Sequence, residues 1–321
     1  MKPRILLTRR LTDKVQKRLC ARFDVVTNDA DMPLSRDALV EAMTAFDVLC
    51  PTITDRIDAA VIGVPGRRVR LIANFGAGTE HIDLHAAASE GVVVTNTPDA
   101  LTGATAELAL TLMLMAARRA GEGEREARAG RWAGWAPTHM LGQTLCGKTL
   151  GLIGFGRIGR AVARLAHALG MHIVYYCRGS VDPSGIAGFS ATQIGSLAEL
   201  AACADVLSVH VPGGTETRHL VDRALFEKMK PGAILVNTSR GPVVDEQALI
   251  AALHDGRIGG AALDVYEHEP AIPLALRQRE NVVILPHLGS ATIETRDAMG
   301  MQMADNVECF LAGERVPNRL V

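Results

Sequence analysis

The sequence predicts an α/β protein built from two doubly wound domains, each with a parallel β-sheet covered by helices. Short runs with the composition of β-strands alternate with helical patterns along nearly the whole chain, which is typical of βαβ units. One long apolar helix interrupts this alternation and divides it into two series. The chain has 321 residues, of which 48% are hydrophobic, and this length favours two domains over one.

The first series of strands lies before Thr97. The runs "RILLT", "FDVVT", "FDVLC", "RLIANF" and "GVVVTN" are separated by helical segments such as "RDALVEAM". The opening "MKPRILLTRR" holds only three consecutive apolar residues, too few for the core of a signal peptide, so we interpret it as the first strand.

The helix that interrupts the pattern is predicted over Ala104 to Ala120, "ATAELALTLMLMAARRA", and is apolar on nearly every face. It is shorter than the ~20 apolar residues that a bilayer requires, and it contains Glu107. We therefore expect a helix buried between domains or subunits, and no association with a membrane.

The second series begins at "TLGLIGFG" and continues through "HIVYYC", "DVLSVHVP", "AILVNTS", "GAALDVY" and "NVVILPH". Helical segments lie between most of these strands, which predicts a second doubly wound sheet. The residues from about Leu288 to Val321 are typical of one helix and a tail.

The composition argues against several classes of function. Lys and Arg number 34 against 35 Asp and Glu, a net charge of −1, so no basic surface is expected to bind nucleic acid or anionic lipid. The six cysteines contain no CxxC pair and predict reduced thiols in a cytoplasmic protein. His81 and His85 lack a third ligand nearby, so we expect a structural or surface role for them and no metal site.

A glycine motif marks the clearest candidate site. Gly154, Gly156 and Gly159 form the pattern GxGxxG directly after the strand "TLGLI" and at the start of a helix. In this context the first glycine permits a tight turn, the second lets a pyrophosphate approach the backbone, and the third allows close packing of the helix. The motif predicts a dinucleotide-binding site.

A second glycine pattern, "GQTLCGKT" from Gly142 to Thr149, matches the phosphate loop GxxxxGK[ST]. A working phosphate loop follows a strand and opens a helix, whereas this segment follows "PTHM" and leads into a strand. We interpret the match as a coincidence.

The residues after the second strand of this domain indicate which dinucleotide binds. NAD-binding folds place an acidic residue about 20 positions past the glycines, where it bonds the ribose hydroxyls. Here that position is Cys177, followed by Arg178 and Ser180, and Arg157 lies in the glycine loop. Because a 2′-phosphate would meet donors instead of a carboxylate, we expect NADPH to be preferred over NADH. The alternative is that Arg178 is solvated and that backbone contacts set the specificity.

Three strand ends of the second sheet carry polar side chains. The run "AILVNTSRGPVVDE" places Arg240 where a strand leaves the sheet, and "VVILPHLGSAT" places His287 in the same way. Ligands of doubly wound sheets bind outside these ends, and a guanidinium matches a carboxylate in two hydrogen bonds. A histidine after a strand is on its own more often a surface residue than a catalyst, but the three ends together favour an active site. The third end, "ALDVYEHEP", offers Asp264, Glu267, His268 and Glu269.

These motifs together resemble the D-isomer-specific 2-hydroxyacid dehydrogenase family over nearly the whole chain. The segments that carry the resemblance are "NFGAGTEHID", "TPDALTGATAELALTLML", "GKTLGLIGFGRIG", "NTSRGPVVDEQAL", "ALDVYEHEP" and "PHLGSAT". Within the family, the "GRWAGWAPTHMLG" segment with Trp132 and Trp135, and the non-acidic "YYCRGS", look most like NADPH-dependent glyoxylate/hydroxypyruvate reductases. Glu80 departs from the usual aspartate of the family, with little expected consequence for catalysis.

The resemblance implies a Rossmann cofactor domain, residues 99–288, inserted into a flavodoxin-like substrate domain made of residues 1–98 and 289–321. It implies that the segment from Phe75 places the amides of Ala77 and Gly78 on the substrate carboxylate, opposite Arg240, and that the chain forms a homodimer. The residues that the resemblance assigns to the cofactor are Thr105, Gly154, Gly156, Arg157, Ile158, Gly159, Arg178, Ser180, Val211, Pro212, Thr217, Thr238, Ser239, Asp264, His287, Gly289 and Ser290.

The expected reaction is reduction of a small 2-keto acid, such as glyoxylate or hydroxypyruvate, to the D-2-hydroxy acid with hydride from NADPH. His287 would give a proton to the developing alkoxide, Glu269 would support the imidazolium, and Arg240 would orient the carboxylate and polarise the carbonyl. The alternatives are a D-3-phosphoglycerate, D-lactate or formate dehydrogenase of the same family, or a nicotinamide-sensing binding protein that resembles a corepressor.

Overall fold

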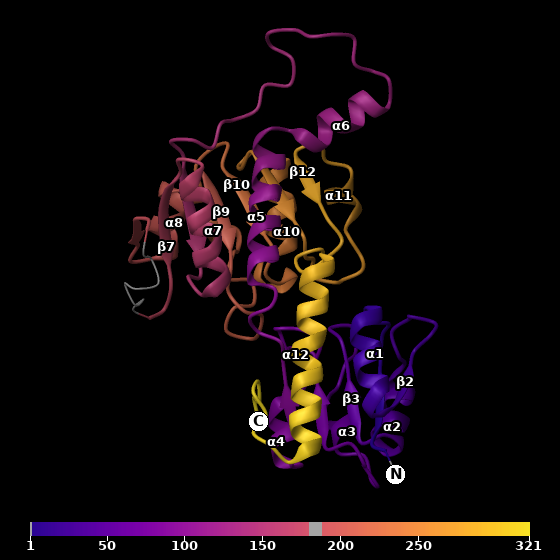
Figure 1. Cartoon of the computed structure of the whole chain (residues 1–321). Helices are drawn as coiled ribbons and strands as arrows, with labels where there is room; N and C mark the ends of the chain where they lie inside the picture. Colours follow the sequence, from indigo (N-terminus) through magenta and orange to yellow (C-terminus); the bar gives the residue numbers. More distant parts are fainter. Residues whose placement is uncertain (1, 180–187) are drawn as a thin grey trace. The chain divides into compact units, whose positions relative to one another are not determined.

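The computed structural model describes residues 2–179 and 188–321 (Figure 1). Contacts divide the chain into two compact units, Met1–Leu101 with Ser290–Val321, and Thr102–Gly289. Each unit contains one parallel sheet with helices on both faces, so the predicted fold class, two doubly wound α/β units, is confirmed.

The first unit holds a five-stranded sheet in the order β2-β1-β3-β4-β5. The strands are β1 (Arg4–Leu7), β2 (Asp24–Thr27), β3 (Val48–Cys50), β4 (Leu71–Ala73) and β5 (Val93–Thr95). The helices are α1 (Asp13–Arg22), α2 (Arg36–Ala45), α3 (Ala59–Ile62), α4 (Leu84–Ser89) and α12 (Ile293–Ala312). Every strand pairs in parallel with its neighbours.

Two separate cores cover the two faces of this sheet. Ile5 and Leu7 belong to the core that contains α1 and α12, whereas Leu6 belongs to the core that contains α2, α3 and α4. Successive residues of a strand point to opposite faces, so a sheet buried on both faces requires consecutive apolar residues, as "RILL" supplies. The C-terminal helix packs tightly here, because a Cβ on Gly300 would lie 2.3 Å from Val15.

The second unit holds a seven-stranded parallel sheet in the order β12-β11-β10-β9-β6-β7-β8. Its strands are β6 (Thr149–Ile153), β7 (His172–Tyr176), β8 (Ala191–Gln193), β9 (Val206–Val209), β10 (Ile234–Asn237), β11 (Gly260–Leu263) and β12 (Val282–Ile284). The order reverses between β6 and β9, which is where doubly wound sheets bind ligands. The edge strand β8 is short and largely exposed, and the strand pattern of the sequence missed it.

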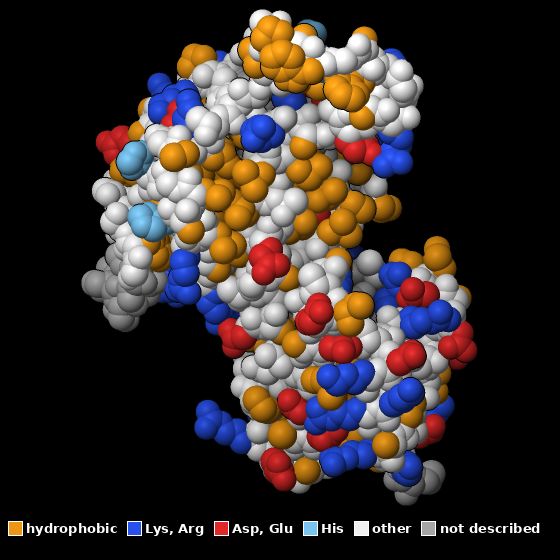
Figure 2. Space-filling model, turned by 45° about the horizontal axis from the view of Figure 1, so that its top comes forward, with side chains coloured by type: hydrophobic (Ala, Val, Ile, Leu, Met, Phe, Trp, Pro, Cys, Tyr) orange, Lys and Arg blue, Asp and Glu red, His pale blue; other side chains and the backbone are white. Residues whose placement is uncertain are grey.

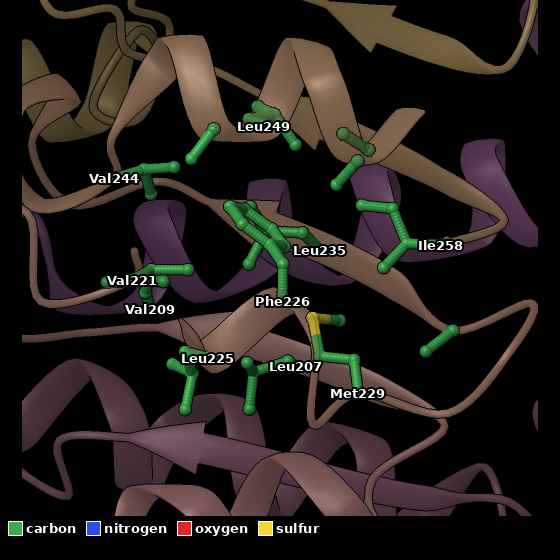
Figure 3. Packing of buried hydrophobic residues seen from close by; sticks show 14 of the residues in the cluster. Leu207, Val209, Val221, Leu225, Phe226, Met229, Leu235, Val244, Leu249 and Ile258 are labelled. Carbon is green, nitrogen blue, oxygen red and sulfur yellow. The ribbon is translucent and has the colours of Figure 1, made fainter. Parts of the chain in front are cut away.

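Helices cover both faces of this sheet as well. They are α5 (Thr102–Ala117), α7 (Arg157–Ala168), α8 (Leu197–Cys203), α9 (Arg223–Phe226), α10 (Glu246–His254) and α11 (Leu274–Arg277). The helix α6 (Ala120–Arg128) contacts α5 and has no buried residue. One core joins α5 and α7 to the sheet, and the other gathers α8, α9 and α10. In the second core Phe226 lies among Leu207, Leu235 and Leu249 (Figure 3).

The apolar helix differs from its predicted form. It ends at Ala117, and Arg119 takes a left-handed conformation with φ of 51° before α6 begins. Only one stripe of α5 is buried, and Leu114 on another face is 38% exposed. In the described part of the chain, no helix is both long and apolar enough to cross a membrane.

Candidate active site

The glycine turn after β6 has little room for side chains. Gly154 has φ of +94°, and a Cβ on it would lie 2.6 Å from the carbonyl oxygen of His210. A Cβ on Gly159 would lie 2.5 Å from the carbonyl oxygen of Gly154. Gly156 caps the N-terminus of α7, and a Cβ there would meet no atom within 4 Å. Gly154 and Gly159 therefore allow the tight turn, whereas Gly156 leaves open space in front of the N-terminus of α7.

The segment after β7 is exposed. The thiol of Cys177 lies 3.0 Å from the carbonyl oxygen of Gly179, and Arg178, whose side chain is 73% exposed, forms an ion pair with Glu216. Ser180, which the sequence assigned to the cofactor, lies outside the described residues. Arg157 and Ile158 form the first turn of α7.

The strand ends beyond β9 and β10 interlock through hydroxyl groups. Thr217 donates from Oγ1 to the carbonyl oxygen of Pro212 at 2.7 Å, and the hydroxyl of Ser239 donates to that of Val211. Thr238, which precedes Ser239, is buried, and its Oγ1 has no hydrogen-bond partner among the described residues. A buried hydroxyl without a partner is uncommon, and a bound ligand is one way to satisfy it.

A histidine and a glutamate pair at the ends of β12 and β11. His287 Nδ1 lies 2.8 Å from Glu269 Oε2, and Glu269 Oε1 accepts a hydrogen bond from the backbone N–H of Tyr266 at 3.0 Å. Burial acts to raise the pKa of Glu269, but the hydrogen bond and charge of His287, the Tyr266 amide and the charge of Arg240 outweigh it, so this pKa is lowered. Glu269 is therefore ionised at neutral pH.

Two buried side chains hold the loops that carry this pair. Tyr266 donates its hydroxyl proton to the carbonyl oxygen of Leu285 at 2.8 Å. The carboxylate of Asp264 accepts from the backbone N–H groups of Leu288 and Gly289 at 2.7 and 2.8 Å, while its carbonyl oxygen accepts from the His287 N–H at 2.9 Å. Gly289 is also fixed by Thr105, which donates to its carbonyl oxygen at 3.0 Å. Ser290 follows and belongs to the first unit.

Arg240 lies at the end of β10, next to β11 in the sheet. Asn237 donates from Nδ2 to its carbonyl oxygen at 3.0 Å. The following residue, Gly241, touches the loop of Tyr266, because a Cβ on it would lie 1.8 Å from the Tyr266 carbonyl oxygen. The ends of β10, β11 and β12 thus bring Arg240, Glu269 and His287 into one part of the second unit.

Two other polar residues of "ALDVYEHEP" do not join this group. Glu267 accepts hydrogen bonds from Arg218 at 2.7 Å and from His219 at 2.8 Å, if Nε2 of the latter carries the proton. His268 pairs through its backbone with Ala271. Among the acidic residues that the sequence offered at this strand end, Glu269 is the one whose carboxylate bonds the imidazole of His287.

In the first unit, hydrogen bonds fix the carbonyl groups of Gly76, Ala77 and Gly78 in the loop after β4. The carbonyl oxygen of Gly78 accepts from Asn74 Nδ2 at 2.9 Å, and that of Ala77 accepts from Asn96 Nδ2 at 2.8 Å. Within the described ranges, no hydrogen-bond acceptor is found for the N–H groups of Ala77 and Gly78. Phe75, at the start of the loop, is 7% exposed. A loop held in this way presents backbone donors that suit an anion.

His81 has a structural partner, because its Nε2 lies 3.0 Å from Oδ1 of Asn74. His85 lies on α4, and no group of residues that could hold a metal ion is found in residues 2–179 and 188–321.

Sequence reasoning missed several residues that shape these loops. His210 follows β9, lies beside the glycine turn and bonds through Nε2 with the hydroxyl of Ser208 at 2.8 Å. Burial lowers the pKa of His210 to about 4, so the ring is neutral at pH 7. Tyr266, Asn74 and Asn96 were also missed. Only the position of each at a strand end could have suggested a role.

Known proteins are similar to this chain over nearly its whole length. Residues 110–289 match the model of the NAD binding domain of D-isomer specific 2-hydroxyacid dehydrogenases. A glyoxylate reductase of Thermococcus litoralis is 40% identical over 324 residues, 99% of this chain and 96% of the relative, and one of Aeropyrum pernix is 41% identical over 322 residues, 99% and 95%.

Solved structures share the fold over the whole chain. An NADPH-dependent glyoxylate/hydroxypyruvate reductase of Sinorhizobium meliloti, in complex with NADP and malonate, has a TM-score of 0.88 at 34% identity and covers 100% of this chain and 97% of its own. D-mandelate dehydrogenase of Rhodotorula graminis has a TM-score of 0.88 at 31% identity, with 99% and 97% covered. The chain belongs to the family of D-isomer-specific 2-hydroxyacid dehydrogenases.

Proposed function

We propose that this dehydrogenase reduces a small 2-keto acid, glyoxylate or hydroxypyruvate, to the D-2-hydroxy acid with NADPH. The observation that carries the proposal is the 2.8 Å hydrogen bond between His287 and Glu269, beside the strand end that bears Arg240. The similarity to glyoxylate reductases over 99% of this chain supports the substrate class.

The described residues fit a nicotinamide dinucleotide. Gly156 leaves open space in front of α7, and the buried hydroxyl of Thr238 lacks a partner among the described residues. We assign the pyrophosphate to the turn from Gly154 to Gly159 and the rest of the cofactor to the residues that the sequence indicates. When bound, the cofactor supplies the hydride for the keto carbon.

His287 supplies the proton. With Nδ1 bonded to the ionised carboxylate of Glu269, the imidazolium keeps its other proton on Nε2, and this proton passes to the oxygen that develops negative charge. After transfer, the same hydrogen bond holds the neutral ring in the tautomer with the proton on Nδ1. The backbone of His287 is fixed for this task by Asp264, although its φ of 57° is unusual for a residue other than glycine.

The substrate carboxylate is bound by Arg240 and by the amides of Ala77 and Gly78. A guanidinium is charged at any working pH and offers two parallel donors to a carboxylate. The unpaired amides of the first unit are further donors of fixed direction. We assign residues 1–98 and 289–321 to the substrate domain and 99–288 to the dinucleotide domain.

The preference for NADPH rests on Cys177 and Arg178. No carboxylate stands at position 177 to repel a 2′-phosphate, and the ion pair of Arg178 with Glu216 is exposed on both sides, so little free energy is needed to open it. The S. meliloti reductase, at 34% identity, was solved with NADP.

The enzyme functions as a cytoplasmic homodimer in this proposal. Apolar side chains gather on the face of the second unit seen in Figure 2. Trp132 and Trp135 are 59% and 82% exposed, and Leu141 is 67% exposed. A cavity of about 630 Å³ is lined by Leu141, by residues of α5 and α6, and by the starts of β10, β11 and β12. Exposed tryptophans are enriched at protein interfaces, so a second copy of the chain would cover them.

A substrate panel tests the proposal. Initial rates are measured with glyoxylate, hydroxypyruvate and pyruvate, each with NADPH and with NADH. The proposal predicts the highest kcat/KM with one of the first two acids and NADPH. Preference for D-3-phosphoglycerate or D-lactate with NAD in the reverse assay would contradict the assigned substrate, and tight NADPH binding without any turnover would favour a sensing protein.

A further inference from the structure

Arg296, on the first turns of α12, is a half-buried cation without an anionic partner. Its guanidinium carbon lies 5.8 Å from the centre of the Phe75 ring. Its side chain makes no ion pair and no hydrogen bond with the described residues, and burial alone lowers the pKa of Arg296. The contrast within the same unit is Arg18, which bonds Asp305 and Glu308.

Such an arrangement is unfavourable unless an anion comes from outside the chain. Removing a guanidinium from water without a counter-charge or hydrogen bonds is costly, and stacking on one aromatic ring offsets only part of that cost. A methionine of similar length would pack against Phe75 without this cost. The position of Arg296 therefore suggests that it binds a ligand.

The loop beside Arg296 points to the kind of ligand. Phe75 leads directly into Gly76, Ala77 and Gly78, whose carbonyl groups are all bonded to the chain. The N–H groups of Ala77 and Gly78 have no acceptor among the described residues. The segment from Phe75 to Gly78 thus has the Arg296 guanidinium beside its first residue and two backbone N–H donors at its end. Both kinds of group bind carboxylates.

We propose that Arg296 is a substrate-binding residue, which together with the amides of Ala77 and Gly78 binds the carboxylate of the keto acid. This proposal rests on the proposed function and deepens it, because it adds a second guanidinium to the one supplied by Arg240. It predicts that keto acids are strongly preferred over the corresponding esters and amides, since two guanidinium groups and two backbone amides would bind the ionised carboxylate.

The test compares Arg296→Met and Arg296→Lys with a matched control, Arg70→Met. Arg70 lies in the same unit, and its guanidinium carbon is 6.0 Å from the centre of the Phe310 ring. It is exposed, however, and lies at the opposite end of β4 from the Phe75 loop. The measurements are kcat and KM for glyoxylate, the Kd of oxalate in the presence of NADP⁺ by calorimetry, and the free energy of unfolding in urea.

We expect Arg296→Met to raise the KM for glyoxylate and the Kd of oxalate by about 10- to 100-fold, the usual effect of losing hydrogen bonds to a charged group. The Kd of NADPH should be unchanged, and the free energy of unfolding should be equal or higher, because an unpaired cation is removed. Arg296→Lys keeps the charge and should recover part of the affinity. Arg70→Met should leave KM and the oxalate Kd as they are.

An unchanged KM and oxalate Kd in Arg296→Met would overturn the inference, and so would a loss of stability with unchanged binding, since Arg296 would then be structural. Either result leaves the proposed function standing if the wild type reduces glyoxylate. Conversely, a wild type that binds oxalate through Arg296 but reduces no keto acid would contradict the proposed function and support the binding site.

Discussion

Gly241 lies at the packing contact between the loop of Arg240 and the loop of Glu269. The substitution Gly241→Ala should push these two loops apart. The added methyl would lie 1.8 Å from the carbonyl oxygen of Tyr266, 1.9 Å from its carbon and 2.4 Å from the N atom of Glu267. All three are backbone atoms, so no side chain can rotate away. Ordinary van der Waals contact begins near 3.4 Å, and therefore one of the two loops must move by about 1.5 Å.

The displacement affects two residues of the proposed reaction. Arg240, which binds the substrate carboxylate, precedes Gly241, and Glu269, which supports His287, is held by the amide of Tyr266. A misplacement of about 1 Å in an active site can cost roughly 10²-fold, so kcat/KM for glyoxylate should fall by about that factor or more. Forcing a methyl into a packed contact typically costs about 1–3 kcal/mol, which sets the expected loss in the free energy of unfolding. The Kd of NADPH should rise by less than kcat/KM falls, because the glycine turn assigned to the pyrophosphate lies after β6 and only Thr238 and Ser239 belong to the displaced loop.

Steady-state rates with glyoxylate and NADPH, and urea denaturation, measure the two effects. The matched control is Gly103→Ala in α5, where the new Cβ would meet no atom within 4 Å. This control should keep its kcat/KM and gain up to about 1 kcal/mol from helix propensity. Wild-type kcat/KM in Gly241→Ala would refute the coupling between the two loops.

Three further substitutions test other parts of the site. Glu269→Gln keeps an acceptor but loses the charge that supports the imidazolium, so kcat should fall by roughly 10², and an unchanged kcat would exclude that role. His210→Gln should make the free energy of unfolding less sensitive to acid. In the wild type the fold keeps this ring neutral, so the free energy of unfolding falls as the pH drops from 6.5 towards 4, by about 2 kcal/mol at pH 5. Urea denaturation at pH 7 and at pH 5 measures this difference. Arg178→Asp should lower kcat/KM with NADPH by at least about tenfold more than with NADH, and an equal loss would contradict the cofactor assignment.

The fold could be predicted because its signals are local. Alternating apolar runs and the GxGxxG spacing lie within short stretches, and the carboxyl ends of parallel strands are known to collect ligands. The sequence thus predicted the strand ends of Arg240 and His287, but it could not show that β10, β11 and β12 are adjacent in this order. The end of α5 before Arg119 also lacks a local signal, since no glycine or proline stands there.

The residues that hold the site depend on contacts between distant segments. The hydroxyl of Tyr266 meets Leu285 on the next strand end, and Arg296 meets Phe75 from the far end of the chain. Neither pair follows a spacing rule, because each depends on how complete elements pack.

The central claim is that an imidazole delivers the proton to the reduced carbonyl. The most direct test is single-turnover oxidation of NADPH by glyoxylate in His287→Ala, together with the Kd of NADPH for the same variant. The account predicts a rate lower by about 10² to 10⁴ with NADPH affinity nearly intact. A rate close to that of the wild type would contradict it.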